Sequence, residues 1–141
     1  MARPEKIKGV PADPKDRRIL IVEDDEDVCG LFESLARREG FQVETAPDGL
    51  DALAKIRRQA PDLVVLDLML PLFGGYETLK RMQEGEGSKV PVIVVSGRYT
   101  DPPTVALIRG EANVVEFIEK PVPPGVLADS LHRHLGTKGR P

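Results

Sequence analysis

The sequence predicts an α/β fold in which a five-stranded parallel sheet is doubly wound, with helices on both faces. Three short runs, at residues 19–22, 63–66 and 92–95, are continuously apolar and rich in β-branched side chains, as in strands covered on both faces. Two weaker strand candidates lie around 41–43 and at 114–118. Between these runs apolar residues recur at helical spacing, so strands and helices alternate along the chain.

Each predicted helix has an apolar face, and several have a recognisable start or end. Gly40 is expected to end the first helix, whereas Asp48 caps the second, which stops before Pro61. Pro102 and Pro103 stand together at the start of the fourth helix, which should therefore be short or irregular. From the first helix to the fifth, the residues expected to face inward are Val28, Leu31, Phe32, Leu35; Ala52, Leu53, Ile56; Leu79, Met82; Val105, Ile108; and Leu127, Leu131, Leu135.

Length and composition restrict the class of protein. The chain has 141 residues, 40% hydrophobic and 30% charged, which suits a single domain with a substantial core. A net charge of -3 does not provide the basic surface that binds phosphates, so no nucleic acid is expected as a partner. No apolar run reaches the ~18 residues of a membrane span, and no secretory signal is visible. The single cysteine, Cys29, excludes an intrachain disulfide, and we expect a cytoplasmic protein with no membrane partner.

The composition also predicts domain boundaries. Residues 1–17 are expected to form a flexible leader, residues 18–136 the folded domain and residues 137–141 a flexible tail, because both ends lack large apolar side chains. The residues after Lys120 suffice for one helix and a tail, which leaves no room for an output domain. The output is therefore expected to be contact with an unknown downstream protein, unless the chain is part of a longer protein.

Polar side chains follow four of the predicted strands at their carboxyl ends, where ligands bind in parallel sheets. Glu23 and Asp24 begin an acidic run after the first strand, Asp67 follows the third, Ser96 the fourth and Lys120 the fifth. Carboxylates ~4 Å apart repel one another by about 4 kcal/mol per pair at an effective dielectric constant near 20, so this cluster should attract cations. Mg²⁺ is a hard divalent ion suited to oxygen ligands. A carboxylate nucleophile beside a metal and a lysine suits phosphoryl transfer.

Each of these residues has an ordinary explanation when it is taken alone. Glu23 and Asp24 could add charge to the start of a helix, and Asp67 could be a turn residue. Ser96 could be a loop hydroxyl and Lys120 an exposed surface lysine. Their occurrence together at the ends of four neighbouring strands favours a functional site.

Four motifs occur in order along the chain. They are Ile19–Asp25, Asp67–Pro71, Ser96–Gly97 and Lys120–Pro121. With these residues the sequence closely resembles the response-regulator receiver family of two-component signalling, of the single-domain type, over roughly residues 18–135. The resemblance implies a flavodoxin-like sheet with strand order 2-1-3-4-5.

The resemblance implies that Asp67 is the phosphoacceptor, which takes a phosphoryl group from a histidine kinase or phosphotransfer protein to give an aspartyl phosphate. Asp24 and Asp67 would bind Mg²⁺ directly, together with the backbone carbonyl of Met69 and, through water, Glu23. Asp25 is the less favoured ligand. The chain would catalyse only its own phosphorylation and dephosphorylation, and would not be an enzyme in the usual sense.

The resemblance also implies supporting roles. Ser96 would hydrogen-bond one phosphoryl oxygen, Lys120 would pair with another, and the Lys120–Pro121 bond would be cis. Phe117, three residues before the lysine, would be the aromatic switch residue. Tyrosine is common there, and a ring without a hydroxyl should favour burial more strongly. Residues 74–75, two glycines, are expected to form a flexible corner at the rim of the site.

Two rival functions stay open at this point. A receiver-like scaffold could work by docking alone, without phosphorylation; the irregular fourth helix mildly favours this reading and the intact carboxylates oppose it. A metal-dependent phosphatase could also form an aspartyl phosphate. Such enzymes usually carry a second acid two residues after the nucleophile, where this chain has Met69.

Overall fold

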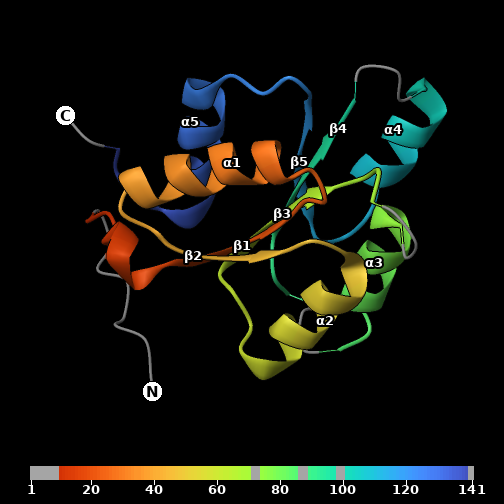
Figure 1. The fold of residues 1–141 in the computed structure, drawn as a ribbon, viewed down its shortest axis with the longest axis horizontal. Helices are drawn as coiled ribbons and strands as arrows, with labels where there is room; N and C mark the ends of the chain where they lie inside the picture. The colour runs from red at the N-terminus through yellow and green to blue at the C-terminus, as the bar shows by residue number, and fades with distance from the viewer. Residues whose placement is uncertain (1–9, 71–73, 86–88, 98–100, 140–141) are drawn as a thin grey trace.

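All five predicted strands are present in one parallel sheet (Figure 1). The structure is a computed structural model that describes residues 10–70, 74–85, 89–97 and 101–139. The strands are β1 (Arg18–Val22), β2 (Gln42–Ala46), β3 (Leu63–Asp67), β4 (Val92–Ser96) and β5 (Val114–Glu119). Their order is β2-β1-β3-β4-β5, and every neighbouring pair is parallel. The predicted fold class and strand order are confirmed.

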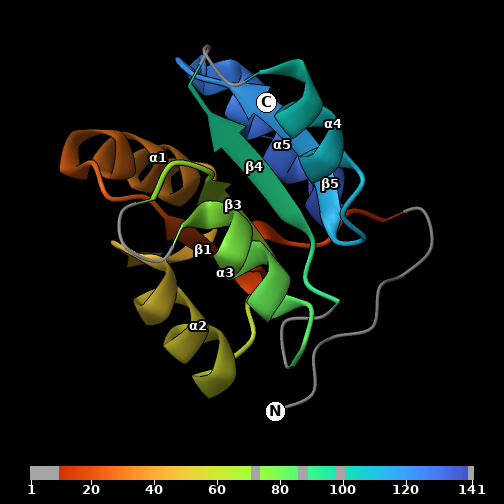
Figure 2. The same ribbon diagram turned by 90° about the vertical axis from the view of Figure 1, so that its right-hand side faces the viewer.

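Helices cover both faces of the sheet (Figures 1 and 2). They are α1 (Glu26–Arg38), α2 (Gly49–Arg58), α3 (Gly75–Met82), α4 (Pro102–Arg109) and α5 (Pro124–Leu135). One apolar cluster joins the sheet to α1 and α5, and a second joins it to α2, α3 and α4. None of the helices described combines the length and apolar character needed to cross a membrane.

The two clusters explain why the central strands are continuously apolar. Successive side chains of a strand point to opposite faces. Leu20 and Leu66 accordingly lie in the cluster under α2, α3 and α4, whereas Ile21 and Val65 lie in the cluster under α1 and α5. Because both faces are covered by helices, alternation of apolar and polar residues is lost in these strands.

The helix ends follow the predicted signals. The Asp48 side chain accepts a hydrogen bond from the N–H of Asp51 at 2.8 Å, and Gly40 has a φ of +100° just after α1. Most of the predicted inward residues are buried. The prediction for Leu31 is wrong, because this side chain is 69% exposed. The buried stripe of α1 runs through Phe32, Leu35 and Ala36, and Leu31 lies at its margin.

The fourth helix is short, as predicted, but it is a regular α-helix of eight residues. Asp101 caps it by accepting a hydrogen bond from the N–H of Thr104 at 2.8 Å. Pro102 and Pro103 occupy its first turn, where the missing N–H groups would have had no partner within the helix. Ile108 is its fully buried residue, and Val105 is half-buried.

The structure differs from the prediction of a flexible leader at residues 12–16. Pro14–Asp16 form a 3₁₀-helix, and the Gln42 side chain donates a hydrogen bond to the carbonyl of Lys15 at 2.7 Å. Ala12 forms an isolated bridge with Thr137, so the two ends of the described chain lie side by side. Polar side chains and backbone groups make these contacts, which is why the lack of apolar residues did not reveal them.

A single carboxylate ties α3 to the loop between α4 and β5. Glu111 accepts hydrogen bonds from the hydroxyl of Tyr76 at 3.2 Å, the ammonium of Lys80 at 3.3 Å and the amide of Gln83 at 3.1 Å. The amide of Gln83 also donates to the side-chain oxygen of Asn113 at 2.8 Å. The hydrogen bond from Gln83, with the help of Lys80 and Tyr76, holds the pKa of Glu111 below its usual value.

We expect Glu111→Gln to destabilise the fold by about 1 kcal/mol at pH 7, because hydrogen bonds to a charged acceptor are lost. The pKa of Glu111 is lower in the folded protein than in the unfolded chain. Its contribution is therefore complete above the ordinary glutamate pKa of 4.5 and is lost as the pH falls through the folded value. Urea unfolding of both proteins between pH 7 and pH 3 should show a gap that closes on acidification. A gap that is independent of pH would contradict this prediction.

Candidate functional site

The carboxyl ends of the strands bring the predicted site residues to one edge of the sheet. Glu23 and Asp24 directly follow β1, and Asp67 is the last residue of β3. Ser96 ends β4, and its carbonyl accepts a hydrogen bond from the N–H of Lys120 at 2.6 Å, just after β5. These backbone connections fix the site residues relative to one another.

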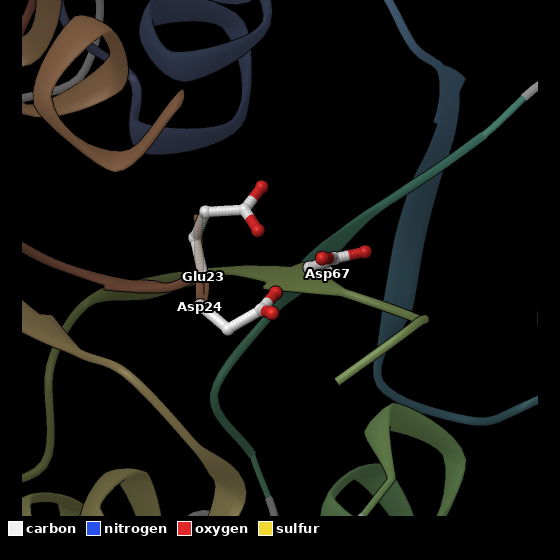
Figure 3. Close-up of side chains that lie close together, drawn as sticks. All are labelled: Glu23, Asp24 and Asp67. Carbon is white, nitrogen blue, oxygen red and sulfur yellow. The ribbon is translucent and has the colours of Figure 1, made fainter. Parts of the chain in front are cut away.

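Three carboxyl groups meet at this edge (Figure 3). One oxygen from each of Glu23, Asp24 and Asp67 can be chosen so that all three lie within 4.8 Å of one another. Glu23 is 3% exposed and Asp67 4%, whereas Asp24 faces solvent. Two buried carboxylates and one exposed carboxylate therefore share a small space that is open on one side.

Lys120 is the cation of this cluster. Its ammonium group forms an ion pair with the carboxylate of Glu23 and lies 3.4 Å from an oxygen of Asp67. Burial lowers the pKa of Lys120, but the hydrogen bond to Glu23 and the charge of Asp67 outweigh burial and leave that pKa raised. Burial and the neighbouring Asp67 raise the pKa of Glu23 to about 7, against the opposing effect of Lys120. The charge of Lys120 thus does not offset the combined effect of burial and of Asp67 on the pKa of Glu23.

The donor set fits a hard divalent cation. All three groups offer carboxylate oxygens, which such ions prefer, and ions of this class commonly bind through one or two carboxylates and retain water. A cation would also offset the negative charge of Asp67, which adds to the effect of burial in raising the pKa of Glu23. The acidic cluster of Glu23, Asp24 and Asp67 could therefore hold a metal ion.

Asp25 has a different task. Its side chain accepts hydrogen bonds from the N–H groups of Asp27 at 2.9 Å and Val28 at 3.1 Å, so it is the N-cap of α1. The ordinary explanation of the acidic run, that it caps a helix, thus holds for Asp25. Because Asp25 is the N-cap, this explanation does not account for Glu23 and Asp24.

The remaining predicted site residues lie on or beside β4 and β5. Ser96 is fully buried at the end of β4, and the Lys120–Pro121 bond is cis. Gly97 is exposed, and a Cβ added there would meet no atom within 4 Å. Phe117 is half-buried and packs against the apolar cluster that joins the sheet to α2, α3 and α4. Pro71, at the end of the second motif, lies outside the described residues.

Gly75 lies close to the backbone at the end of β3, although the sequence predicted a flexible corner at residues 74–75. The N–H of Met69 donates a hydrogen bond to Asp67 at 3.0 Å, and the side chain of Met69 is exposed. A Cβ at Gly75 would lie 2.5 Å from the carbonyl oxygens of Asp67 and Leu68. Gly75 is therefore needed for close packing of α3 on the strand end that carries Asp67, whereas Gly74 has open space around it. Sequence reasoning missed this role because a glycine does not reveal which backbone it approaches.

Comparison with known proteins gives relatives that are named as regulatory proteins. The chain is 35% identical to the transcriptional regulatory protein AfsQ1 of Streptomyces coelicolor over 109 residues, which cover 77% of this chain and 47% of AfsQ1. It is 34% identical to the DNA-binding response regulator MtrA of Mycobacterium tuberculosis over 120 residues, covering 84% of this chain and 50% of MtrA. The chain therefore spans about half the length of these curated relatives.

These relatives contradict the prediction that nucleic acid is not a partner. MtrA is named as a DNA-binding protein, although the matching segment is half of it. The net charge of -3 and the small number of residues after Lys120 are properties of this chain alone. Neither observation can exclude nucleic acid as a partner of a regulator of this kind, nor require that the output be a protein contact.

The family itself follows from agreement among sequence, fold and site. Residues 19–132 match the response regulator receiver domain. The fold matches the crystal structure of the receiver domain of NtrX from Brucella abortus with a TM-score of 0.75 and 33% identity, covering 85% of this chain and 99% of that one. With its acidic cluster, Ser96 and Lys120 at the carboxyl edge of the sheet, this chain belongs to the response-regulator receiver domain family.

Proposed function

We propose that this chain is the phosphoacceptor of a two-component phosphorelay. Asp67 takes a phosphoryl group from a histidine kinase or phosphotransfer protein in a Mg²⁺-dependent reaction, and the chain then signals through a changed protein-binding surface. The observation that carries this proposal is the meeting of Asp67 with Glu23, Asp24 and Lys120. Membership of the receiver domain family supports it.

In the proposed step, a carboxylate oxygen of Asp67 attacks the phosphorus atom of a phosphohistidine. A P–O bond forms as the P–N bond breaks, and the imidazole of the donor leaves with the electron pair and takes up a proton. One oxygen of Asp67 accepts the N–H of Met69 at 3.0 Å, which fixes the orientation of the carboxylate before attack. Attack of water on the phosphorus atom would then form a new P–O bond, break the P–O bond to Asp67 and release inorganic phosphate with the carboxylate restored, so the chain acts on itself and not on a separate substrate.

The neighbouring residues would stabilise the transferred group. A bound Mg²⁺, held by Asp24, Asp67 and the carbonyl of Met69 and through water by Glu23, would neutralise charge on the phosphoryl oxygens. The ammonium of Lys120 would pair with one of these oxygens, and the hydroxyl of Ser96 would donate a hydrogen bond to another. We include in this proposal the cytoplasmic location that the sequence predicts.

Intact-mass spectrometry of the wild-type chain with acetyl phosphate tests the proposal. We expect a gain of one phosphoryl group in the presence of Mg²⁺ and none with EDTA, because the metal must offset the carboxylate charges. Peptide mapping after borohydride reduction should place the modification at Asp67. No gain under either condition, and none from a phosphorylated histidine donor, would favour the docking scaffold that works without phosphorylation.

A further inference from the structure

The ring of Phe117 is in contact with a cation as well as with the core. Its apolar contacts are with the cluster under α2, α3 and α4, which contains the buried Ile108. The guanidinium carbon of Arg109, the last residue of α4, lies 5.9 Å from the ring centroid. This separation is within the range of a cation–π interaction.

We propose that Arg109 is a positioning residue for the aromatic switch. Its guanidinium stabilises the half-buried orientation of Phe117 and thereby sets how readily the ring moves when Asp67 is phosphorylated. This inference rests on the proposed function and on the switch role that the family resemblance implies for Phe117, and it adds a residue that neither the motifs nor the acidic cluster contains. Arg109 touches neither the phosphoryl group nor the reacting atoms.

Both partners of this contact are anchored. Phe117 belongs to β5 and pairs with Val94 in β4, so its backbone is part of the sheet. Arg109 is followed closely by Glu111, which accepts hydrogen bonds from Lys80 of α3 and from Gln83, the residue that caps α3 at its carboxyl end. The end of α4 is thus held in place from the other side.

The chemistry of phenylalanine makes such a contact important. Phe117 has no hydroxyl group, so no hydrogen bond from the ring can favour one orientation over another. Packing and the cation must therefore define its position, which is half-buried. None of the ion pairs recorded among the described residues involves Arg109, so its guanidinium is not shared with a carboxylate there.

A second arginine near β5 provides a matched control. Arg133 of α5 donates a hydrogen bond to the carboxylate of Glu116 at 2.7 Å and forms an ion pair with it. Its side chain is 59% exposed. Replacing either Arg109 or Arg133 by glutamine removes one positive charge near β5, but only the first replacement removes a cation from the ring.

The ring can be observed directly by ¹⁹F NMR of the full chain labelled with 4-fluorophenylalanine. The chain has four phenylalanines, and Phe117→Leu assigns the signal of Phe117. Spectra are recorded with and without beryllofluoride and Mg²⁺, which mimic the aspartyl phosphate. Beryllofluoride with Mg²⁺ defines one state of the Phe117 ring in the wild type. In Arg109→Gln we expect the population of this ring state to be about two- to fivefold higher before any ligand is added. By reciprocity, the beryllofluoride concentration at half-saturation should fall by the same factor.

The outcomes separate this inference from the function on which it rests. An Arg109→Gln spectrum and titration equal to the wild type, or an equal change in Arg133→Gln, would overturn the role of Arg109 alone. A wild-type Phe117 signal that does not respond to beryllofluoride with Mg²⁺ would overturn the switch itself, and the role of Arg109 with it. Because Arg109 is exposed, its replacement leaves the apolar core intact.

Discussion

Replacement of Asp67 by asparagine is expected to abolish phosphorylation and, in the same protein, to stabilise the fold. An amide is not a nucleophile toward phosphorus, so no acyl phosphate can form. Asp67 and Glu23 are both buried, with carboxylate oxygens within 4.8 Å of each other, and the charge of Asp67 contributes to the raised pKa of Glu23. Removing that charge relieves repulsion, while Lys120 keeps its ion pair with Glu23. We expect a gain of about 1 kcal/mol in the free energy of unfolding.

Two measurements check this result. Intact mass after incubation with acetyl phosphate and Mg²⁺ reports phosphorylation, and urea unfolding in EDTA reports stability. With Mg²⁺ present the gap in stability should narrow, because a metal that binds the folded wild type stabilises it. Asp25→Asn is the matched control, since asparagine still caps α1 while one acidic charge near the site is lost. Retained phosphorylation of Asp67→Asn, or a less stable Asp67→Asn protein, would contradict the assignment.

Much of the architecture could be predicted from the apolar strands, and much of the site could be predicted from the residues at the carboxyl ends of those strands. Continuous β-branched runs marked β1, β3 and β4, and the carboxyl ends of parallel strands meet at one edge. Asp67, Ser96 and Lys120 could therefore be placed together from their positions in the sequence alone. The weaker strands β2 and β5 lie at the two edges of the sheet, where partial exposure dilutes the apolar pattern.

What was missed depends on side-chain contacts between distant segments. Leu31 matched the helical spacing of its neighbours, but spacing does not tell how wide a stripe the sheet covers. The contact of Lys120 with Glu23 joins residues 97 positions apart, and the cation over Phe117 comes from another element. The net charge led to the wrong prediction that nucleic acid is not a partner. It describes only the residues of this chain, whereas the matching segment is half of the DNA-binding regulator MtrA.

Gly75 offers a sharp test of how the phosphoacceptor strand is held, because local propensity and packing predict opposite results. Gly75 is the first residue of α3, where serine should be favoured over glycine by a few tenths of a kcal/mol. A Cβ there, however, would lie 2.5 Å from the carbonyl oxygens of Asp67 and Leu68, which are backbone atoms that cannot rotate away. We expect Gly75→Ser to destabilise the fold by about 2–3 kcal/mol, measured by urea unfolding.

The same clash should reach the chemistry, since relief requires α3 or the backbone after β3 to move. The N–H of Gly75 donates a hydrogen bond to Leu68 at 3.1 Å, and the adjacent Asp67 carries the nucleophile. Small displacements of a reacting group are costly, so labelling by acetyl phosphate should slow by about 10- to 100-fold under conditions where the variant is folded. Gly74→Ser is the control, because its Cβ meets no atom within 4 Å and serine is a good N-cap, so both stability and labelling should stay near wild type. If Gly75→Ser were as stable and as reactive as Gly74→Ser, close packing of α3 would have no part in positioning Asp67.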